Sequence, residues 1–364
     1  MDFVALELIR GLQEIDRENE YFIFVNAAEE LDRIPSTDNF TVVVRNGLYA
    51  WWEQWTLPRL LKKYKIDLLH CTANTAPLNI RVPLIVTVHD LIYFETHPLW
   101  AKGYSSYQRF GNFYRRVVVR NILEKARKIL TVSHFEASNF SRMFPRLDLS
   151  KVHVVYNSVG SHFGIVQGDV LKDEVRKRYS LPDRFVLMLG NTDPKKNTRL
   201  AIQSFLLALP DLDPKMSLVL GDLDPGILNV WFGLDERDSL EGRLIFTGYL
   251  DNRDLPMVLN LAEALYYPSK RESFGIPILE GMASGCPVIC SRTSSMPEIG
   301  LEAAHYVNPD DVQDMKRGLI AVLNDFDERQ RMKLAGLERA QRFSRKRMAQ
   351  SVLDHYKQVY DASI

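Results

Sequence analysis

Residues 264–290 alternate apolar runs with turn-forming residues in an order that limits what the chain can fold into. Residues 264–267 are apolar and end at a proline, which is typical of a buried strand. Residues 274–277 predict a turn, and Pro277 can occupy the first position of a helix over 278–284. Residues 286–290 predict a second buried strand. Together they predict a strand–turn–helix–strand unit of an α/β fold.

Two glutamates stand at defined places in this unit. Glu272 lies in the predicted loop and Glu280 lies one turn into the predicted helix. Backbone N–H groups at the start of a helix bind anions, and carboxylates can hold hydroxyl groups, so the combination suits a nucleotide sugar. The alternative is a pair of solvated charges, since charged side chains are mostly exposed. The glycines, prolines and apolar strands around Glu272 and Glu280 favour a nucleotide-sugar site over a pair of solvated charges.

The length and composition describe an ordinary globular protein of two domains. At 364 residues the chain exceeds the usual size of a single core. Lys plus Arg and Asp plus Glu both number 46, so no net charge favours nucleic acid as a partner. The three cysteines, Cys71, Cys286 and Cys290, have no zinc-ligand spacing, and no metal site is expected. Without a long apolar run or signal peptide, the expected location is the cytoplasm.

Short apolar runs alternate with helical patterns along the whole chain, which predicts doubly wound parallel sheets. We expect an N-terminal domain over 1–165, a C-terminal domain over 166–344, and a last segment, 345–364, whose helix packs back on the first domain. The linker is expected at 157–169. Strands are expected at 21–25, 41–44, 66–70, 83–88, 128–132, 152–156, 185–189, 217–220, 244–247, 264–267 and 288–290.

Further candidate residues follow predicted strands. Gly190 opens a turn after 185–189 that ends in Lys195 and Lys196, and ligands of open α/β sheets bind at such strand ends. The alternative is two solvated lysines. His89 follows 83–88 and could hydrogen-bond a sugar or a transferring oxygen, although a lone histidine is more often structural. His70 is a weaker candidate by the same argument.

Residues 270–290 closely resemble the signature of retaining glycosyltransferase family 4, which has the two-domain GT-B fold. Other matches, each weak alone, follow the order of the mannosyltransferase-like branch of that family. They comprise residues 52–54, 57–58, 66–70, 87–91, 131–133, 154–157, 193–197, 246–248 and 294–298. Their number and order support the resemblance over most of the chain.

The resemblance implies a role for each candidate residue. Glu272 would contact the donor sugar, Glu280 would bind the ribose, and Lys196 would bind the diphosphate. Many members carry an Arg where this chain has Asn191, so Lys195 would supply the second positive charge. The remaining implied contacts are the backbone amides of Phe274, Gly275 and Ile276 near the sugar and diphosphate, the Gly190 turn, and His89 at the sugar.

The resemblance implies a metal-independent enzyme without a cofactor. It would move a hexose, with mannose favoured, from a GDP- or UDP-linked donor to a glycan or lipid-linked sugar acceptor, with front-face departure and attack. The expected setting is surface polysaccharide or lipopolysaccharide biosynthesis. Alternatives are a nucleotide-sugar 2-epimerase of the same fold, and a nucleotide-sugar-binding protein with impaired turnover.

Two expectations concern the N-terminal domain. The family opens with a strand and a glycine-rich turn, whereas this sequence starts in a predicted helix over 1–18, so we expect a domain without that strand, and two domains facing a cleft. Residues 102–128 are basic with interleaved aromatics. They predict either a helix with one solvated face, or a peripheral contact with anionic lipid at the inner face of the membrane or with a lipid-linked acceptor.

Overall fold

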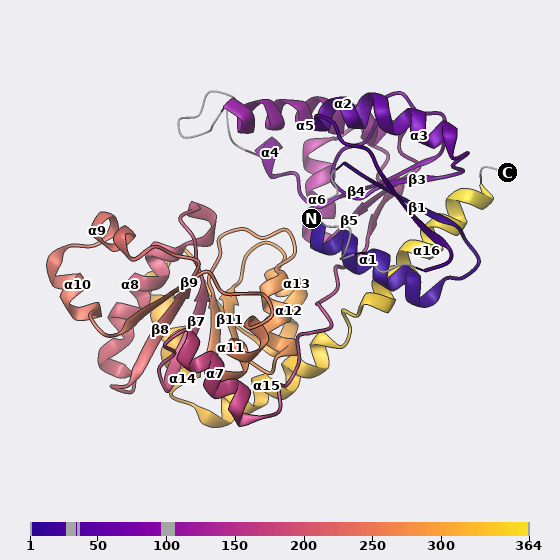
Figure 1. Ribbon diagram of the computed structural model, residues 1–364. Coiled ribbons are helices and arrows are strands. Elements are labelled where there is room, and N and C mark those ends of the chain that lie inside the picture. Colours follow the sequence, from indigo (N-terminus) through magenta and orange to yellow (C-terminus); the bar gives the residue numbers. More distant parts are fainter. Residues whose placement is uncertain (1, 27–33, 35–36, 96–105, 363–364) are drawn as a thin grey trace. The chain divides into compact units, whose positions relative to one another are not determined.

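The structure is a computed structural model that describes the chain apart from residues 1, 27–33, 35–36, 96–105 and 363–364 (Figure 1). The chain forms two compact units. Unit 1 comprises Met1–Ser158 and Arg345–Ile364, and unit 2 comprises Val159–Ser344. The sequence placed the boundary between 165 and 166, whereas the compact units divide at 158–159.

Unit 2 contains a six-stranded parallel sheet in the order β12-β11-β10-β7-β8-β9 (Figure 1). Its strands are β7 (Arg184–Leu189), β8 (Met216–Gly221), β9 (Leu244–Gly248), β10 (Ala264–Tyr267), β11 (Val288–Ser291) and β12 (Ala304–Val307). The chain winds outward from β7 in one direction and from β10 in the other. This is the doubly wound arrangement that the alternating pattern predicts, with β12 as an additional strand that the sequence analysis did not identify.

Helices cover the sheet of unit 2. Alternate strand residues such as Val186, Leu218 and Tyr266 are buried with α8 and α14 in one core. The α-helices are α7 (Asp169–Arg178), α8 (Thr198–Ala208), α9 (Leu228–Trp231), α10 (Leu234–Leu240), α11 (Leu255–Leu261), α12 (Ile276–Ala283), α13 (Met296–Gly300), α14 (Val312–Leu323) and α15 (Phe326–Ala340). Short 3₁₀ helices are η4 (Pro194–Lys196), η5 (Leu209–Asp211), η6 (Pro225–Ile227) and η7 (Leu301–Ala303). Because both faces of a parallel sheet need cover, its strands read as continuous apolar runs.

Unit 1 has two parallel sheets where the sequence predicted one. The first contains β1 (Tyr21–Val25) and β2 (Phe40–Val44), and the second has the order β3-β4-β5-β6. Within the described residues, no strand ladder joins β1 to β3. The sheets nevertheless share both hydrophobic cores, because Phe24 of β1 packs in one core and Ile23 in the other. Strands of the second sheet are β3 (Leu69–Cys71), β4 (Leu84–Val88), β5 (Lys128–Thr131) and β6 (Val152–Val154).

The helices of unit 1 include one in each of the predicted segments 1–18, 102–128 and 345–364. They are α1 (Asp2–Ile15), α2 (Tyr49–Trp51), the π-helix η2 (Trp52–Thr56), α3 (Leu57–Lys63), α4 (Ile92–Glu95), α5 (Ser106–Lys125), α6 (His134–Met143), the 3₁₀ helix η3 (Leu149–Lys151) and α16 (Arg345–Asp361). The part of 102–128 before Ser106 lies outside the described residues. Over the residues that the structure describes, none of these helices combines the length and apolarity needed to cross a bilayer.

Helices α1 and α16 pack closely, although they come from opposite ends of the chain. Arg345 Nε donates to Glu7 Oε2 at 2.9 Å, and its Nη1 donates to Glu14 Oε1 at 2.9 Å. Glu7 is buried, so this charge pair is shielded from water. Gly11 permits the close approach, since a Cβ placed there would lie 2.7 Å from the Cβ of Ala349.

We predict that Gly11→Ala destabilises the protein. An alanine in a helix interior normally stabilises by about 0.5–1 kcal/mol. At Gly11 the new methyl group overlaps α16, so a loss of about 1–3 kcal/mol is expected instead. The matched control is Gly111→Ala in α5, where a Cβ would meet only Arg115 Nη1 at 3.5 Å. Chemical denaturation of both variants checks this; equal stability of the two would contradict the packing argument.

Candidate functional site

Two loops meet at the carboxyl edge of the unit 2 sheet. They follow β7 and β10, which are neighbouring parallel strands, so their ends emerge side by side. The backbone N–H of Lys270 donates to the carbonyl of Lys195 at 2.7 Å. Asn197 Nδ2 donates to the carbonyls of Pro268 at 3.1 Å and Pro309 at 2.7 Å. These bonds hold the 190–197 loop against the 268–275 loop.

Lys196 lies at the centre of this junction. Its Nζ is 2.7 Å from Glu272 Oε1 and donates to the Tyr267 hydroxyl at 2.7 Å. The side chains of Lys196 and Glu272 are only 19% and 15% exposed, so the ion pair is poorly screened by water. An ammonium has three N–H donors, and the third can serve a ligand oxygen. Burial raises the pKa of the Tyr267 phenol well above its ordinary value, which keeps it neutral.

The backbone of Glu272 is held by a neighbouring turn. Its N–H donates to Ser294 Oγ at 3.0 Å, and Ser295 Oγ donates to its carbonyl at 2.9 Å. Thr293 Oγ1 donates to the carbonyl of Lys270 at 3.1 Å. The loop that carries Glu272 is therefore fixed on one side by residues 293–295 and on the other by Lys195.

The 268–275 loop leads into α12 through a glycine whose conformation other residues rarely adopt. Gly275 has φ +93°, and a Cβ there would lie 3.2 Å from Ile278 Cδ1. Phe274 is buried and its ring packs on Phe343, with centroids 6.0 Å apart. The helix begins at Ile276, two residues earlier than the sequence predicted, which moves Pro277 to its second position. The N–H of Ile278 donates to the Gly275 carbonyl at 3.0 Å and Pro277 has no N–H, so anion binding at this end depends on the N–H of Ile276 and on the helix dipole.

Glu280 lies on α12, one turn beyond its start. Burial of the carboxyl group raises its pKa from 4.5 to about 7. The carboxyl therefore titrates much closer to neutral pH than an ordinary glutamate. A hydrogen-bonding ligand can then meet either form of it.

The first loop also depends on a close approach. A Cβ on Gly190 would lie 3.1 Å from Thr198 Cγ2, and Thr198 Oγ1 donates to the carbonyl of Asn191 at 2.7 Å. Lys195 Nζ is 3.7 Å from Asp193 Oδ2 and is 39% exposed, so it does not join the Lys196 contact. Within the described residues, no three His, Cys, Asp or Glu side chains form a group that could hold a metal ion.

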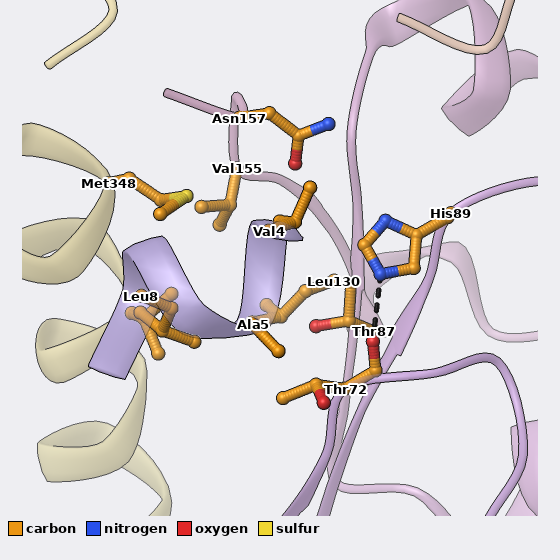
Figure 2. Close-up of a pocket in the computed structure, with 11 residues that line it drawn as sticks. Val4, Ala5, Leu8, Thr72, Thr87, His89, Leu130, Val155, Asn157 and Met348 are labelled. Carbon is orange, nitrogen blue, oxygen red and sulfur yellow. Dashed lines mark hydrogen bonds between the residues drawn. The ribbon is translucent and has the colours of Figure 1, made fainter. Parts of the chain in front are cut away.

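His89 lies in unit 1, where its N–H donates to Asn74 Oδ1 at 2.7 Å and its ring contacts a backbone carbonyl. Its Nε2 donates to the Thr72 carbonyl at 2.7 Å, which assigns the proton to Nε2 and makes Nδ1 an acceptor. Burial lowers the pKa of the imidazole, so the ring is neutral. The ring borders a small cavity beside Val4 and Ala5 of α1 (Figure 2).

His70, the weaker candidate, is a structural residue. Its Nδ1 is 2.7 Å from the Tyr356 hydroxyl and its Nε2 is 2.7 Å from Thr87 Oγ1. Burial lowers the pKa of the imidazole to about 3. Both ring nitrogens are occupied, so His70 has no position left for a ligand.

The structure thus gathers most of the expected residues in unit 2. Lys196 and Glu272 are in direct contact, whereas Lys195 lies beside them. Gly190, Phe274, Gly275, Ile276 and Glu280 belong to the same two loops and to α12, while His89 belongs to unit 1. Sequence reasoning missed Tyr267, Asn197 and the serines at 294–295. The polar Tyr267 at the end of an apolar strand was the available signal for the first of these.

Comparisons with known proteins find similarity to glycosyltransferases in both halves of the chain. Residues 2–161 match the family profile described as Glycosyltransferase Family 4, and residues 172–339 match Glycosyl transferases group 1. The O-antigen chain mannosyltransferase B of Escherichia coli is 27% identical over 97% of this chain and 94% of that protein. Serotype-specific mannosyltransferase WbdA of Escherichia coli is 29% identical over 78% of this chain, which spans only 34% of that protein.

A solved structure gives the same fold. Anabaena HepE in complex with UDP-glucose superposes with a TM-score of 0.71 and 16% identity, over 98% of this chain and 95% of that one. At this identity the likeness concerns the fold. It places two Rossmann-like α/β domains with parallel sheets in the GT-B class.

We predict that Glu280 makes stability depend on pH. Because its folded-state pKa lies above 4.5, the stability due to the protonated form is fully present below about pH 4.5 and is lost as pH rises through about 7. Glu280→Gln removes this loss. The difference in melting temperature, variant minus wild type, should therefore increase from about pH 5 to about pH 8. Thermal denaturation across this range tests it, and a constant difference would show that folding does not raise the pKa of Glu280.

Proposed function

Because this chain is a glycosyltransferase of the GT-B fold, we propose that it transfers a hexose, with retention of configuration, from a nucleoside diphosphate sugar to a glycan or lipid-linked sugar acceptor. The observation that carries the proposal is the Lys196–Glu272 pair at the carboxyl edge of the unit 2 sheet. A cation and a carboxylate 2.7 Å apart match the two ends of the bond that must break, a diphosphate and a sugar.

In this proposal Lys196 binds the diphosphate. Its ammonium offsets the charge that builds on the leaving group, and in a partly buried site this effect is large. Lys195, which is more exposed, contributes a second positive charge at the outer side of the diphosphate. The donor competes with Glu272 for the Lys196 ammonium, and Glu272 then accepts hydrogen bonds from sugar hydroxyls.

The start of α12 is proposed to bind the sugar and the diphosphate of the donor as well. The backbone N–H groups of Phe274, Gly275 and Ile276 contribute at the sugar and diphosphate, because a helix N-terminus favours negative charge. Gly190 lets the first loop stay close to the Thr198 side chain at the start of α8. Glu280 accepts hydrogen bonds from the ribose hydroxyls, which favours its ionised form on binding.

His89 contributes Nδ1 to a sugar hydroxyl as a hydrogen-bond acceptor, since its Nε2 proton is engaged by Thr72. The reaction proposed is front-face substitution. The bond from the sugar carbon to the diphosphate oxygen breaks, the acceptor hydroxyl attacks on the same face, and its proton passes to the departing oxygen. No cofactor or metal takes part in this scheme.

Mannose is the favoured sugar because the two relatives named above, which match 97% and 78% of the chain, are mannosyltransferases. One of them builds O-antigen chains, which supports an acceptor of the polysaccharide or lipopolysaccharide type. The donor nucleotide is GDP or UDP. A protein of similar fold was solved with UDP-glucose, so donors with either nucleotide belong in the test.

We predict selective binding of one nucleotide sugar to the purified chain. Calorimetry with GDP-mannose, UDP-glucose and UDP-N-acetylglucosamine should identify the donor, and Glu280→Ala should weaken its binding by about 10- to 150-fold, as loss of charged hydrogen bonds costs about 1.5–3 kcal/mol. Release of nucleoside diphosphate should then require a sugar acceptor. Isomerisation of the sugar without release would identify an epimerase, and binding without turnover would identify a binding protein. Binding of no donor would contradict the proposal.

We predict that Lys196→Met lowers kcat by about 10²–10³, the usual effect of removing a group that stabilises developing charge. Lys195→Met should have a smaller effect because its side chain is more exposed. The matched control is Lys316→Met, which removes a surface pair with Asp211 elsewhere in unit 2. Melting temperatures exclude unfolding as the cause. Equal kcat values for the Lys196 and Lys316 variants would remove Lys196 from the reaction.

A further inference from the structure

Glu53 is a buried carboxylate of unit 1 that the proposed reaction leaves without a role. It lies in η2, where Trp52 and Glu53 are buried while the neighbouring Trp51 and Trp55 are 59% and 51% exposed. A carboxylate is costly to remove from water unless other groups satisfy it. The contacts that Glu53 makes inside unit 1 therefore need an explanation.

Uncharged hydrogen-bonding groups surround the Glu53 carboxylate. Thr75 Oγ1 donates to its Oε1 at 2.5 Å, and the Tyr49 hydroxyl lies 3.2 Å from the same oxygen and 2.6 Å from Thr75 Oγ1. Gln54 Nε2 donates to Oε2 at 3.0 Å, and the Tyr114 hydroxyl of α5 donates to that oxygen as well. Both carboxylate oxygens are thus engaged, which fixes the Glu53 side chain in one place.

Glu53 and Gln54 together hold the loop that follows β3. Besides the bond from Thr75 to Glu53, the Leu78 N–H donates to Gln54 Oε1 at 2.8 Å. Gln54 Nε2 also donates to the Ala76 carbonyl at 3.2 Å. Two consecutive residues of η2 therefore contact three residues of one loop. Both belong to a π-helix, a rare conformation that occurs frequently at functional sites.

The same loop holds His89. The Thr72 carbonyl accepts the Nε2 proton of His89 at 2.7 Å (Figure 2), and Asn74 Oδ1 accepts its backbone N–H at 2.7 Å. Asn74 is buried with φ +65°, a left-handed conformation, and its own N–H donates to the Thr87 carbonyl at 2.9 Å. Because Thr75 follows Asn74 directly, the hydroxyl bound to Glu53 and the groups bound to His89 belong to one four-residue segment, 72–75.

The Thr72 carbonyl decides which nitrogen of His89 carries the proton. A neutral imidazole has one N–H and one acceptor nitrogen, and a carbonyl can only accept. With the carbonyl in place, the proton is on Nε2 and Nδ1 is an acceptor. When segment 72–75 moves away, either nitrogen can carry the proton, and the ring loses the bond that sets its orientation.

We propose that Glu53 is a positioning residue for His89. By anchoring Thr75 it holds the Thr72 carbonyl in place, and this carbonyl fixes the tautomer and the orientation of the imidazole. The consequence for sugar transfer rests on the proposed contact of His89 Nδ1 with a sugar hydroxyl, whereas the consequence for the imidazole does not. A purely structural Glu53 would stabilise η2 and α5 and leave the state of His89 unchanged.

Nitrogen NMR of the full chain, labelled with ¹⁵N-histidine, tests the proposal without any substrate. Ring nitrogens with and without a proton give separate signals, and His89→Ala assigns those of His89 among the eight histidines. The wild type should show a protonated Nε2 and an unprotonated Nδ1. Glu53→Gln places an amide donor among the groups that donate to the carboxylate, so it should shift the proton wholly or partly to Nδ1. The same tautomer in both proteins would overturn the proposal.

A matched control separates this effect from loss of a buried carboxylate in general. Asp16 is also a buried carboxylate of unit 1, and it accepts from the Tyr21 hydroxyl at 2.5 Å and from Asn19 Nδ2 at 2.7 Å. Asp16→Asn should therefore leave the tautomer of His89 unchanged, even where it lowers the melting temperature. An equal change of tautomer in the Asp16 variant would contradict a specific role for Glu53.

Thr75→Val tests the link itself. It keeps Glu53 and removes only the hydroxyl that joins the carboxylate to the 72–75 segment. The variant should change the tautomer of His89 as Glu53→Gln does, and it gives the answer where Glu53→Gln fails to fold. A folded Thr75 variant with the wild-type tautomer would overturn the proposal.

Transfer kinetics connect Glu53 to the proposed reaction. Glu53→Gln should lower kcat by about 10- to 100-fold, the usual effect of misplacing a group at the reacting centre. In a His89→Ala background the same change should cost less than about twofold, because two residues that act as one unit are not additive. Equal losses in both backgrounds would overturn the positioning role. Unchanged kcat in His89→Ala alone would contradict the proposed sugar contact instead, and the NMR comparison then decides the role of Glu53.

Discussion

Hydrogen bonding between the parallel strands β7 and β10 is the constraint on which the candidate site depends. These strands are far apart in the sequence, and their pairing brings their following loops to one place. The loops are then joined by the Lys270 N–H bond to Lys195 and by the two amide bonds of Asn197. Lys196 meets Glu272 because this framework leaves each side chain little room to move.

The electrostatics of unit 2 suit the exchange of partners that the proposed reaction needs. Lys196 and Glu272 neutralise each other in the protein without donor, so neither charge is left unpaired in a partly buried place. A diphosphate and a sugar can replace these contacts with stronger ones at both groups. Glu280, with a pKa of about 7, adds a carboxyl whose ionisation a ribose can favour.

Unit 1 is organised differently. Its strands form two sheets that are joined by shared cores instead of a continuous ladder, and α1 and α16 cover one of those cores. The close crossing at Gly11 and the buried pair of Glu7 with Arg345 fix these two helices to each other. The residues proposed for donor binding lie in unit 2, apart from His89 of unit 1.

The sequence by itself determined the local features: the α/β alternation, most strand positions, and the placement of Glu272, Glu280 and Lys196 after or beside predicted strands. These follow from apolar runs and turn residues, which act over a few positions. Only the tertiary structure decided the pairing of β7 with β10, the contact of Lys196 instead of Lys195 with Glu272, and the division of the unit 1 sheet. It also decided which tryptophans are exposed. Each of these depends on contacts between residues far apart in the chain, and no local pattern encodes which distant partners will meet.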